Sequence, residues 1–196
     1  MKNPSLNSLL LGTMLLSLSP LACGAEPLES ELIVVPQVDL NRYMGTWYSI
    51  ASIPQVFDRK CVGGTSANYT LKAGGTVAVR NACYLSDGSL SQAKGVAWVA
   101  DPKTNAKLKV TFILSFLRLN FLAGDYWILD LGPNYEYAVV GHPSRKYGWI
   151  LSRTPALSEE MFQGIVKRLE DQGYDFSRFQ MVNQKDYPGM APRSQP

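Results

Sequence analysis

The chain of 196 residues has one histidine, three cysteines and a net charge of only +3, and each scarcity excludes a class of function. The histidine, His142, lies in a Gly-His-Pro segment typical of an exposed turn. A metal site needs several such ligands, so neither a metal nor a cofactor is expected. A charge so close to zero argues against nucleic acid as a partner. Ser152 has no base near it in the sequence, so we expect no catalytic residues and no enzymatic activity.

The N-terminal segment, residues 1–22, is predicted to be a secretory signal. Lys2 precedes an apolar stretch over residues 9–18, and small residues follow it, as in export signals. The stretch is too short to span a bilayer. Beyond the signal, the expected divisions are a linker over 23–37, a folded domain over 38–184 and a C-terminal tail over 185–196.

Processing of this signal has two alternative outcomes. Residues 18–23 resemble a bacterial lipobox, in which Cys23 is acylated and becomes the mature N-terminus. Pro20 and Leu21 depart from that pattern, and cleavage just beyond Cys23 would instead release a soluble protein into the periplasm or the medium. We expect lipidation of Cys23, and Gly24 after it resembles the signal for sorting to the outer membrane.

Either outcome leaves Cys61 and Cys83 as the remaining cysteines, in an oxidising compartment. Their even number favours a disulfide over a metal site or a catalytic thiol. Cys61 precedes one predicted strand and Cys83 ends the strand paired with it. The bond would therefore attach a loop to the barrel wall, and closing a loop of about 20 residues contributes roughly 3 kcal/mol.

Residues 38–184 show short strands separated by Gly, Asn, Asp and Pro, a pattern typical of a barrel or sandwich. The eight expected ranges are 46–54, 64–72, 76–85, 90–100, 106–116, 125–131, 136–141 and 147–153. Short connections imply antiparallel neighbours, and eight strands close into a barrel that holds one small ligand. The predicted fold class is all-β, an eight-stranded antiparallel up-and-down barrel.

One α-helix is expected after the last strand. Ser158 suits its N-cap and Gly173 its C-terminal end. Its apolar residues recur at helical spacing and form one stripe, made of Met161, Phe162, Ile165, Val166 and Leu169. The stripe predicts a helix packed on the outside of the barrel. A membrane-surface helix is the weaker alternative, because the polar face is not strongly basic.

Three segments, in this order, resemble the lipocalin family. They are residues 38–48 with Gly45-Thr46-Trp47-Tyr48, residues 67–69 with Ala67-Asn68-Tyr69, and residues 149–155. The resemblance extends from about Val38 to Val182 and is greatest to the bacterial outer-membrane lipocalins, with apolipoprotein D as their animal relative. It implies that Gly45, Trp47 and Arg153 form a closed barrel floor, with the guanidinium packed over the indole.

With Trp47 pointing inward, the alternation of side chains along a strand indicates which residues line the barrel. Together with the resemblance it predicts an apolar and aromatic inner wall. The expected ligand-binding residues are Ser49, Ala51, Val77, Val79, Tyr126, Ile128, Val139, Trp149 and Leu151. Alternation also places Ile53 and Tyr147 on this wall. Such a wall suits an acyl chain, whose burial contributes about 0.8 kcal/mol per methylene.

The resemblance implies a carrier or store of fatty acids or lysophospholipids, anchored at the periplasmic face of the outer membrane and used in membrane maintenance. The basic residues Arg59, Lys60 and Arg118 are candidates for holding a carboxylate or phosphate at the open end. The alternatives are a barrel filled by its own side chains, a soluble secreted carrier of another apolar molecule such as a pigment, and a lipid-modifying enzyme.

The segment 112–122 is unusually apolar for the end of a strand and its loop. Alternation places only half of it in the barrel. Three interpretations remain open: a loop folded on the barrel rim, a lip that touches a membrane, and a contact of a homodimer.

Overall fold

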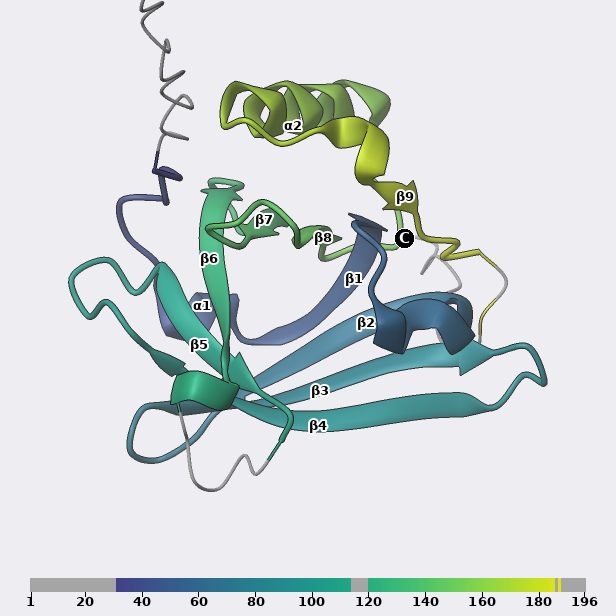
Figure 1. Cartoon of the computed structure of the whole chain (residues 1–196), viewed down its shortest axis with the longest axis horizontal. Helices are drawn as coiled ribbons and strands as arrows, with labels where there is room; N and C mark the ends of the chain where they lie inside the picture. Colours follow the sequence, from purple (N-terminus) through teal and green to yellow (C-terminus); the bar gives the residue numbers. More distant parts are fainter. Residues whose placement is uncertain (1–30, 114–119, 186, 188–196) are drawn as a thin grey trace, which may run out of the picture.

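In the computed structural model, which describes residues 31–113, 120–185 and 187, nine strands form one sheet that closes on itself (Figure 1). Eight of them make an antiparallel up-and-down barrel, because β1 pairs with both β2 and β8. The short strand β9 (Gln180–Met181) adds to β1 from outside. These pairings confirm the predicted fold class.

The barrel strands are β1 (Gly45–Ser52), β2 (Cys61–Leu71), β3 (Thr76–Leu85), β4 (Leu90–Val99), β5 (Lys107–Thr111), β6 (Gly124–Leu131), β7 (Tyr137–Gly141) and β8 (Gly148–Ser152). In the described part of the chain, the helices are α1 (Leu40–Tyr43), α2 (Glu159–Asp171) and three short 3-10 helices, η1 (Val56–Lys60), η3 (Asn120–Leu122) and η4 (Phe176–Arg178). Strand β5 ends five residues before the predicted position 116. The Thr111 hydroxyl lies 2.9 Å from the carbonyl oxygen of Ile113 and 3.1 Å from that of Leu122, so it turns the chain out of the sheet.

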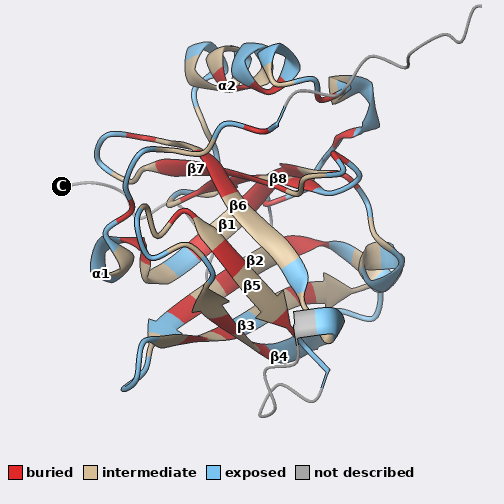
Figure 2. Ribbon diagram, turned by 60° about the vertical axis from the view of Figure 1, so that its left-hand side comes forward, coloured by how far each residue is buried: buried red, intermediate tan, exposed pale blue. Residues whose placement is uncertain are grey.

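Helix α2 lies across the outside of the barrel over β7 and β8, as predicted (Figure 1). The hydroxyl of Ser158 accepts a hydrogen bond from the amide of Met161, and Gly173 ends the helix with a φ of 80°. Ile165 and Leu169 are buried against the strands. Because the helix covers their outer face, all positions of β7 are buried rather than every second one (Figure 2).

A β-bulge between Ser49 and Ala51 shifts the alternation along β1 by one residue. Ala51 pairs with Ile150 and, together with Ile53, packs in the cluster beneath α2. The predictions that Ala51 and Ile53 line the barrel are therefore wrong. Ser52 takes the inward position instead, because it pairs with an inward residue of β8.

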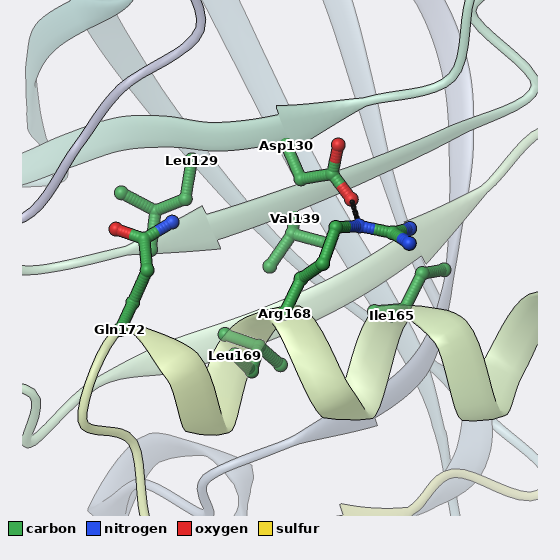
Figure 3. Close-up of a pocket in the computed structure, with 7 residues that line it drawn as sticks. All are labelled: Leu129, Asp130, Val139, Ile165, Arg168, Leu169 and Gln172. Carbon is green, nitrogen blue, oxygen red and sulfur yellow. Dashed lines mark hydrogen bonds and ion pairs between the residues drawn. The ribbon is translucent and has the colours of Figure 1, made fainter.

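The inward orientation predicted for Val139 is also wrong. Val139 pairs with Ile150, and both side chains point to the outer face of the sheet. Figure 3 shows Val139 directed toward α2, where it packs with Ile165 and Leu169. Its neighbour Val140 belongs to the core inside the barrel and is fully buried.

The chain before the barrel also packs on it. Leu32 is buried in the cluster beneath α2, the amide of Val35 donates to the carbonyl of Ile128, and Glu31 forms an ion pair with Lys107. Residues 31–37, the second half of the predicted linker, therefore lie against the barrel. Among the described residues, no helix combines the length and apolar character that a membrane span requires.

Candidate functional site: the barrel interior

The barrel has a sealed floor built on Trp47, whose side chain is completely buried. The guanidinium of Arg153 lies 3.7 Å from the centre of the indole ring. Its nitrogens donate to the carbonyls of Thr46 at 2.9 Å and Arg42 at 2.7 Å, and the indole nitrogen donates to the carbonyl of Tyr43 at 2.9 Å. The predicted pairing of Trp47 with Arg153 is therefore present.

Gly45, the third residue predicted for the floor, has a φ of 95°. A Cβ at this position would stand 3.3 Å from a guanidinium nitrogen of Arg153. Only glycine adopts this conformation without strain, so Gly45 lets the arginine cross the end of β1 closely.

The inner wall is closely packed just above the floor and more accessible farther up. The predicted Val77, Val79, Ile128 and Leu151 are almost entirely buried, although Leu71, Val99 and Leu131 at the floor end of their strands are partly exposed. Side chains farther up, Tyr126, Trp149, Val110 and Ser52, are only partly buried although they face the interior. The structure thus brings seven of the nine predicted ligand-binding residues, Ser49 among them, onto one inner wall that opens opposite the floor.

Three tyrosines meet inside the barrel above the floor. The hydroxyl of Tyr126 on β6 lies 2.8 Å from that of Tyr43 on α1 and 3.1 Å from that of Tyr69 on β2. Burial raises the pKa of Tyr43 and Tyr126 well above the usual value and the pKa of Tyr69 to about 12, so all three are neutral near pH 7. Sequence reasoning named Tyr126 but missed the other two. Both occur in the segments that resemble the lipocalin family, and this resemblance is the sequence signal that could have identified them.

Polar atoms gather on the wall formed by β1, β2 and β3. The side-chain nitrogen of Gln184 donates to the carbonyls of Ser49 at 2.7 Å and Thr65 at 2.8 Å, and so bridges β1 and β2 where they separate. Among the described residues, three buried side-chain oxygens have no hydrogen-bond partner: Ser49 Oγ, Asn81 Oδ1 and Gln184 Oε1. Ser49 and Asn81 belong to inward positions, so this wall has polar groups that a ligand could use.

The open end carries exposed apolar side chains. They come from the β1–β2 and β5–β6 connections, opposite the floor, and we call them the apolar rim: Val56, Phe57, Phe112, Ile113 and Phe121. Arg59 and Lys60 are exposed on η1 in the same connection. Arg118 lies outside the described residues, as does most of the apolar segment around it.

The predicted disulfide is present and joins Cys61 to Cys83, with Cα atoms 5.6 Å apart. It links the start of β2 to β3 and leaves neither sulfur as a free thiol. Among the described residues, no group of three or more His, Cys, Asp or Glu side chains could hold a metal. Cys23 lies outside the described residues.

The single histidine lies in the turn between β7 and β8. One ring nitrogen of His142 lies 2.9 Å from the hydroxyl of Ser144, and desolvation is the main cause that lowers the pKa of His142. Tyr147 stands against the imidazole ring in the same turn. Tyr147 precedes β8, which begins at Gly148, and its predicted inward orientation stays a prediction.

Two further hollows are weaker candidates for a ligand site. The cavity between α2 and the barrel has a volume of about 10 Å³, enough for a single water. A broader hollow of about 270 Å³ lies on the outer face of β1 to β4. Most of its lining is polar, including Thr46, Tyr48, Asn68, Arg80 and Gln92. The interior of the barrel is the surface that combines a closed end with apolar walls.

Known proteins share this sequence pattern. The family model of the lipocalin-like domain matches residues 38–184. Temperature-induced lipocalin-1 of Arabidopsis thaliana is 43% identical over 162 residues, which cover 82% of this chain and 87% of the relative. Outer membrane lipoprotein Blc of Escherichia coli K12 is 36% identical over 164 residues, covering 83% and 89%. Apolipoprotein D of Mus musculus is 31% identical over 159 residues, covering 76% and 79%.

Solved structures agree on the fold. Insecticyanin from the tobacco hornworm Manduca sexta superposes with a TM-score of 0.62 at 22% identity, covering 79% of this chain and 85% of that chain. Apocrustacyanin C1 superposes with a TM-score of 0.59 at 19% identity, covering 76% and 81%. At these identities the likeness supports the barrel architecture and nothing finer.

Proposed function

The chain belongs to the lipocalin family, whose members bind small hydrophobic ligands, and on that premise we propose that its barrel carries or stores a fatty acid or lysophospholipid. The observation that carries the proposal is the change in side-chain burial along the inner wall, from closely packed above the floor to partly exposed farther up. The floor is sealed by Trp47 and Arg153, while the inward side chains of Tyr126, Trp149 and Val110 remain partly accessible above it. A cup closed at one end and apolar on its wall suits a single acyl chain.

The polar end of such a lipid would lie toward the mouth. Burying each methylene contributes about 0.8 kcal/mol, so the chain supplies the affinity and the head group stays near water. Arg59 and Lys60 on η1 are exposed there and supply positive charge for a carboxylate or phosphate. The apolar rim beside them would let the mouth rest on a lipid surface while a ligand enters or leaves. Pairing of two chains through this rim is the alternative, and sedimentation velocity without membranes distinguishes the two.

Replacing Trp149 by aspartate is expected to weaken binding of single-chain lipids by at least about tenfold, because a charge is placed on the apolar wall. Displacement of an apolar fluorescent dye by hexadecanoic acid measures the change. Tyr48→Asp is the matched control, since it adds the same charge on the outer face of the barrel. Equal affinity in the Trp149 variant and the wild type would remove the upper wall from the binding site.

We further propose that the protein is anchored at the outer membrane by an acylated Cys23. The lipobox-like residues 18–23 and the similarity to an outer membrane lipoprotein support this part of the proposal. In a bacterial host, Cys23→Ser is expected to abolish labelling by a radioactive fatty acid, because the variant lacks the thiol that is acylated. It is also expected to release the protein from sedimented outer membranes, because the acyl chains that would hold it there are missing. N-terminal mass analysis of the wild type is the decisive control. A mature chain that begins after Cys23 would refute the anchor and leave the binding proposal intact.

A further inference from the structure

The three tyrosine hydroxyls inside the barrel hold one proton more than their mutual hydrogen bonds use. Tyr43, Tyr69 and Tyr126 are neutral and carry three hydroxyl protons. Two hydrogen bonds join them, both to the oxygen of Tyr126. Among the described residues, these hydroxyls have no further partner. One O–H group of the three is therefore available to a molecule that enters the barrel.

Burial indicates which proton is available. Tyr43 and Tyr69 are 3% and 8% exposed, whereas Tyr126 is only partly buried and faces the accessible part of the inner wall. An unsatisfied donor is most costly where nothing can reach it. The favoured arrangement has Tyr43 and Tyr69 both donating to the oxygen of Tyr126, which then directs its own proton away from both and into the open interior.

We propose that the Tyr126 hydroxyl donates a hydrogen bond to an uncharged oxygen at the inner end of the ligand. The ligand class is then a long-chain molecule with a hydroxyl or carbonyl oxygen at the end that enters first, rather than one that ends in a plain methyl group. This inference rests on the proposed function and narrows its ligand. Beside Tyr126, the inner face of β5 and β6 is apolar, with Ile128 and Leu108 almost fully buried, so on this side of the cup the hydroxyl is a polar point among apolar side chains.

The surroundings favour a neutral oxygen over a carboxylate at this depth. The cation at the floor is Arg153, which lies against Trp47 and donates three hydrogen bonds, to the carbonyls of Thr46, Arg42 and Tyr135. The backbone thus holds this guanidinium at the barrel end. A carboxylate beside Tyr126 would lose its hydration without gaining an ion pair, which costs far more than burying a hydroxyl.

The test compares pairs of ligands that differ at one end. Fatty acids of several lengths are measured beside the ω-hydroxy acids of the same length, by dye displacement. In the wild type, we expect the ω-hydroxy acid of the best length to bind at least as tightly as the plain acid. Without a partner, burying its hydroxyl would lower the affinity by about tenfold or more. A wild type that disfavours the ω-hydroxy acid to that extent at every length overturns the inference without any variant.

The variant Tyr126→Phe removes the donor and keeps the ring. We expect it to lose about tenfold in affinity for the ω-hydroxy acid while its affinity for the plain acid changes by less than about twofold. Tyr69→Phe is the matched control, because it removes one hydroxyl of the cluster and leaves the free proton of Tyr126. Thermal unfolding and near-UV circular dichroism show that each variant is folded.

The outcomes separate the two proposals. The compared quantity is the affinity for the ω-hydroxy acid divided by the affinity for the plain acid of the same length. If this ratio is the same in Tyr126→Phe and the wild type, the inference is contradicted. It is also contradicted if Tyr69→Phe lowers the ratio as much as Tyr126→Phe does. Plain fatty acids that still bind in that case leave the proposed function standing. Failure of the wild type to bind either kind of acid would instead refute the proposed function itself.

Discussion

Replacing Arg153 by alanine is expected to lower the free energy of unfolding by about 2 to 3 kcal/mol. The guanidinium lies 3.7 Å from the centre of the Trp47 ring and donates to three carbonyls, those of Arg42, Thr46 and Tyr135. Its removal takes away the cation–π contact and leaves the indole and those carbonyls without their partner. Urea unfolding, followed by tryptophan fluorescence, measures the loss.

Two further substitutions show what the arginine supplies. Arg153→Lys keeps the charge but lacks the planar set of donors, so it should fall between the wild type and alanine. Arg42 also stands over an aromatic ring, 4.1 Å from the centre of Tyr135, but its side chain is exposed. Arg42→Ala should therefore cost less than about 1 kcal/mol. An Arg153→Ala protein with wild-type stability and altered ligand preference would make Arg153 a recognition residue rather than a floor plug.

The features that the sequence predicted correctly depend on local chemistry or on a strong motif. The cap at Ser158, the stripe of Ile165 and Leu169 and the glycine at 173 are all contained within one short segment, so helical periodicity was sufficient to place α2. The floor required only that Trp47 and Arg153 keep the roles that the lipocalin resemblance implies.

The errors came from rules that hold only along an uninterrupted strand. Alternation assigns a face correctly until a bulge adds a residue, and neither Ser49 nor Ala51 has a sequence feature that marks the bulge between them. Val139 was misplaced for a related reason. Both faces of β7 are buried, so apolar character does not distinguish the side that faces the lumen from the side that faces α2.

The tyrosine cluster could not be derived from spacing at all. Tyr43 and Tyr126 are separated by 83 positions, and Tyr69 and Tyr126 by 57. Only closure of the barrel brings their hydroxyls together. The bridge from Gln184 across β1 and β2 is equally non-local, because it spans 135 and 119 positions. The polar groups of the interior are thus brought together only by tertiary structure, whereas the apolar character of its wall could be predicted from the alternation of residues along the strands.

Removing the disulfide with the double substitution Cys61→Ala and Cys83→Ala is expected to lower the free energy of unfolding by about 3 kcal/mol. The bond spans 22 positions, and without it the unfolded chain gains the freedom of that loop. The urea transition should move to lower concentration and become steeper, because the unfolded state exposes more surface when it is not cross-linked.

The effect should stay confined to stability, because the deep wall around Val77, Ile128 and Leu151 packs without help from the sulfurs. Affinity for single-chain lipids is therefore expected to change by less than about twofold. Reduction of the wild type provides the control, since it breaks the same bond without changing a side chain. A reduced protein as stable as the oxidised one would show that other contacts hold the start of β2 in place. Tyr187 offers one, because its hydroxyl donates to the carbonyl of Val62.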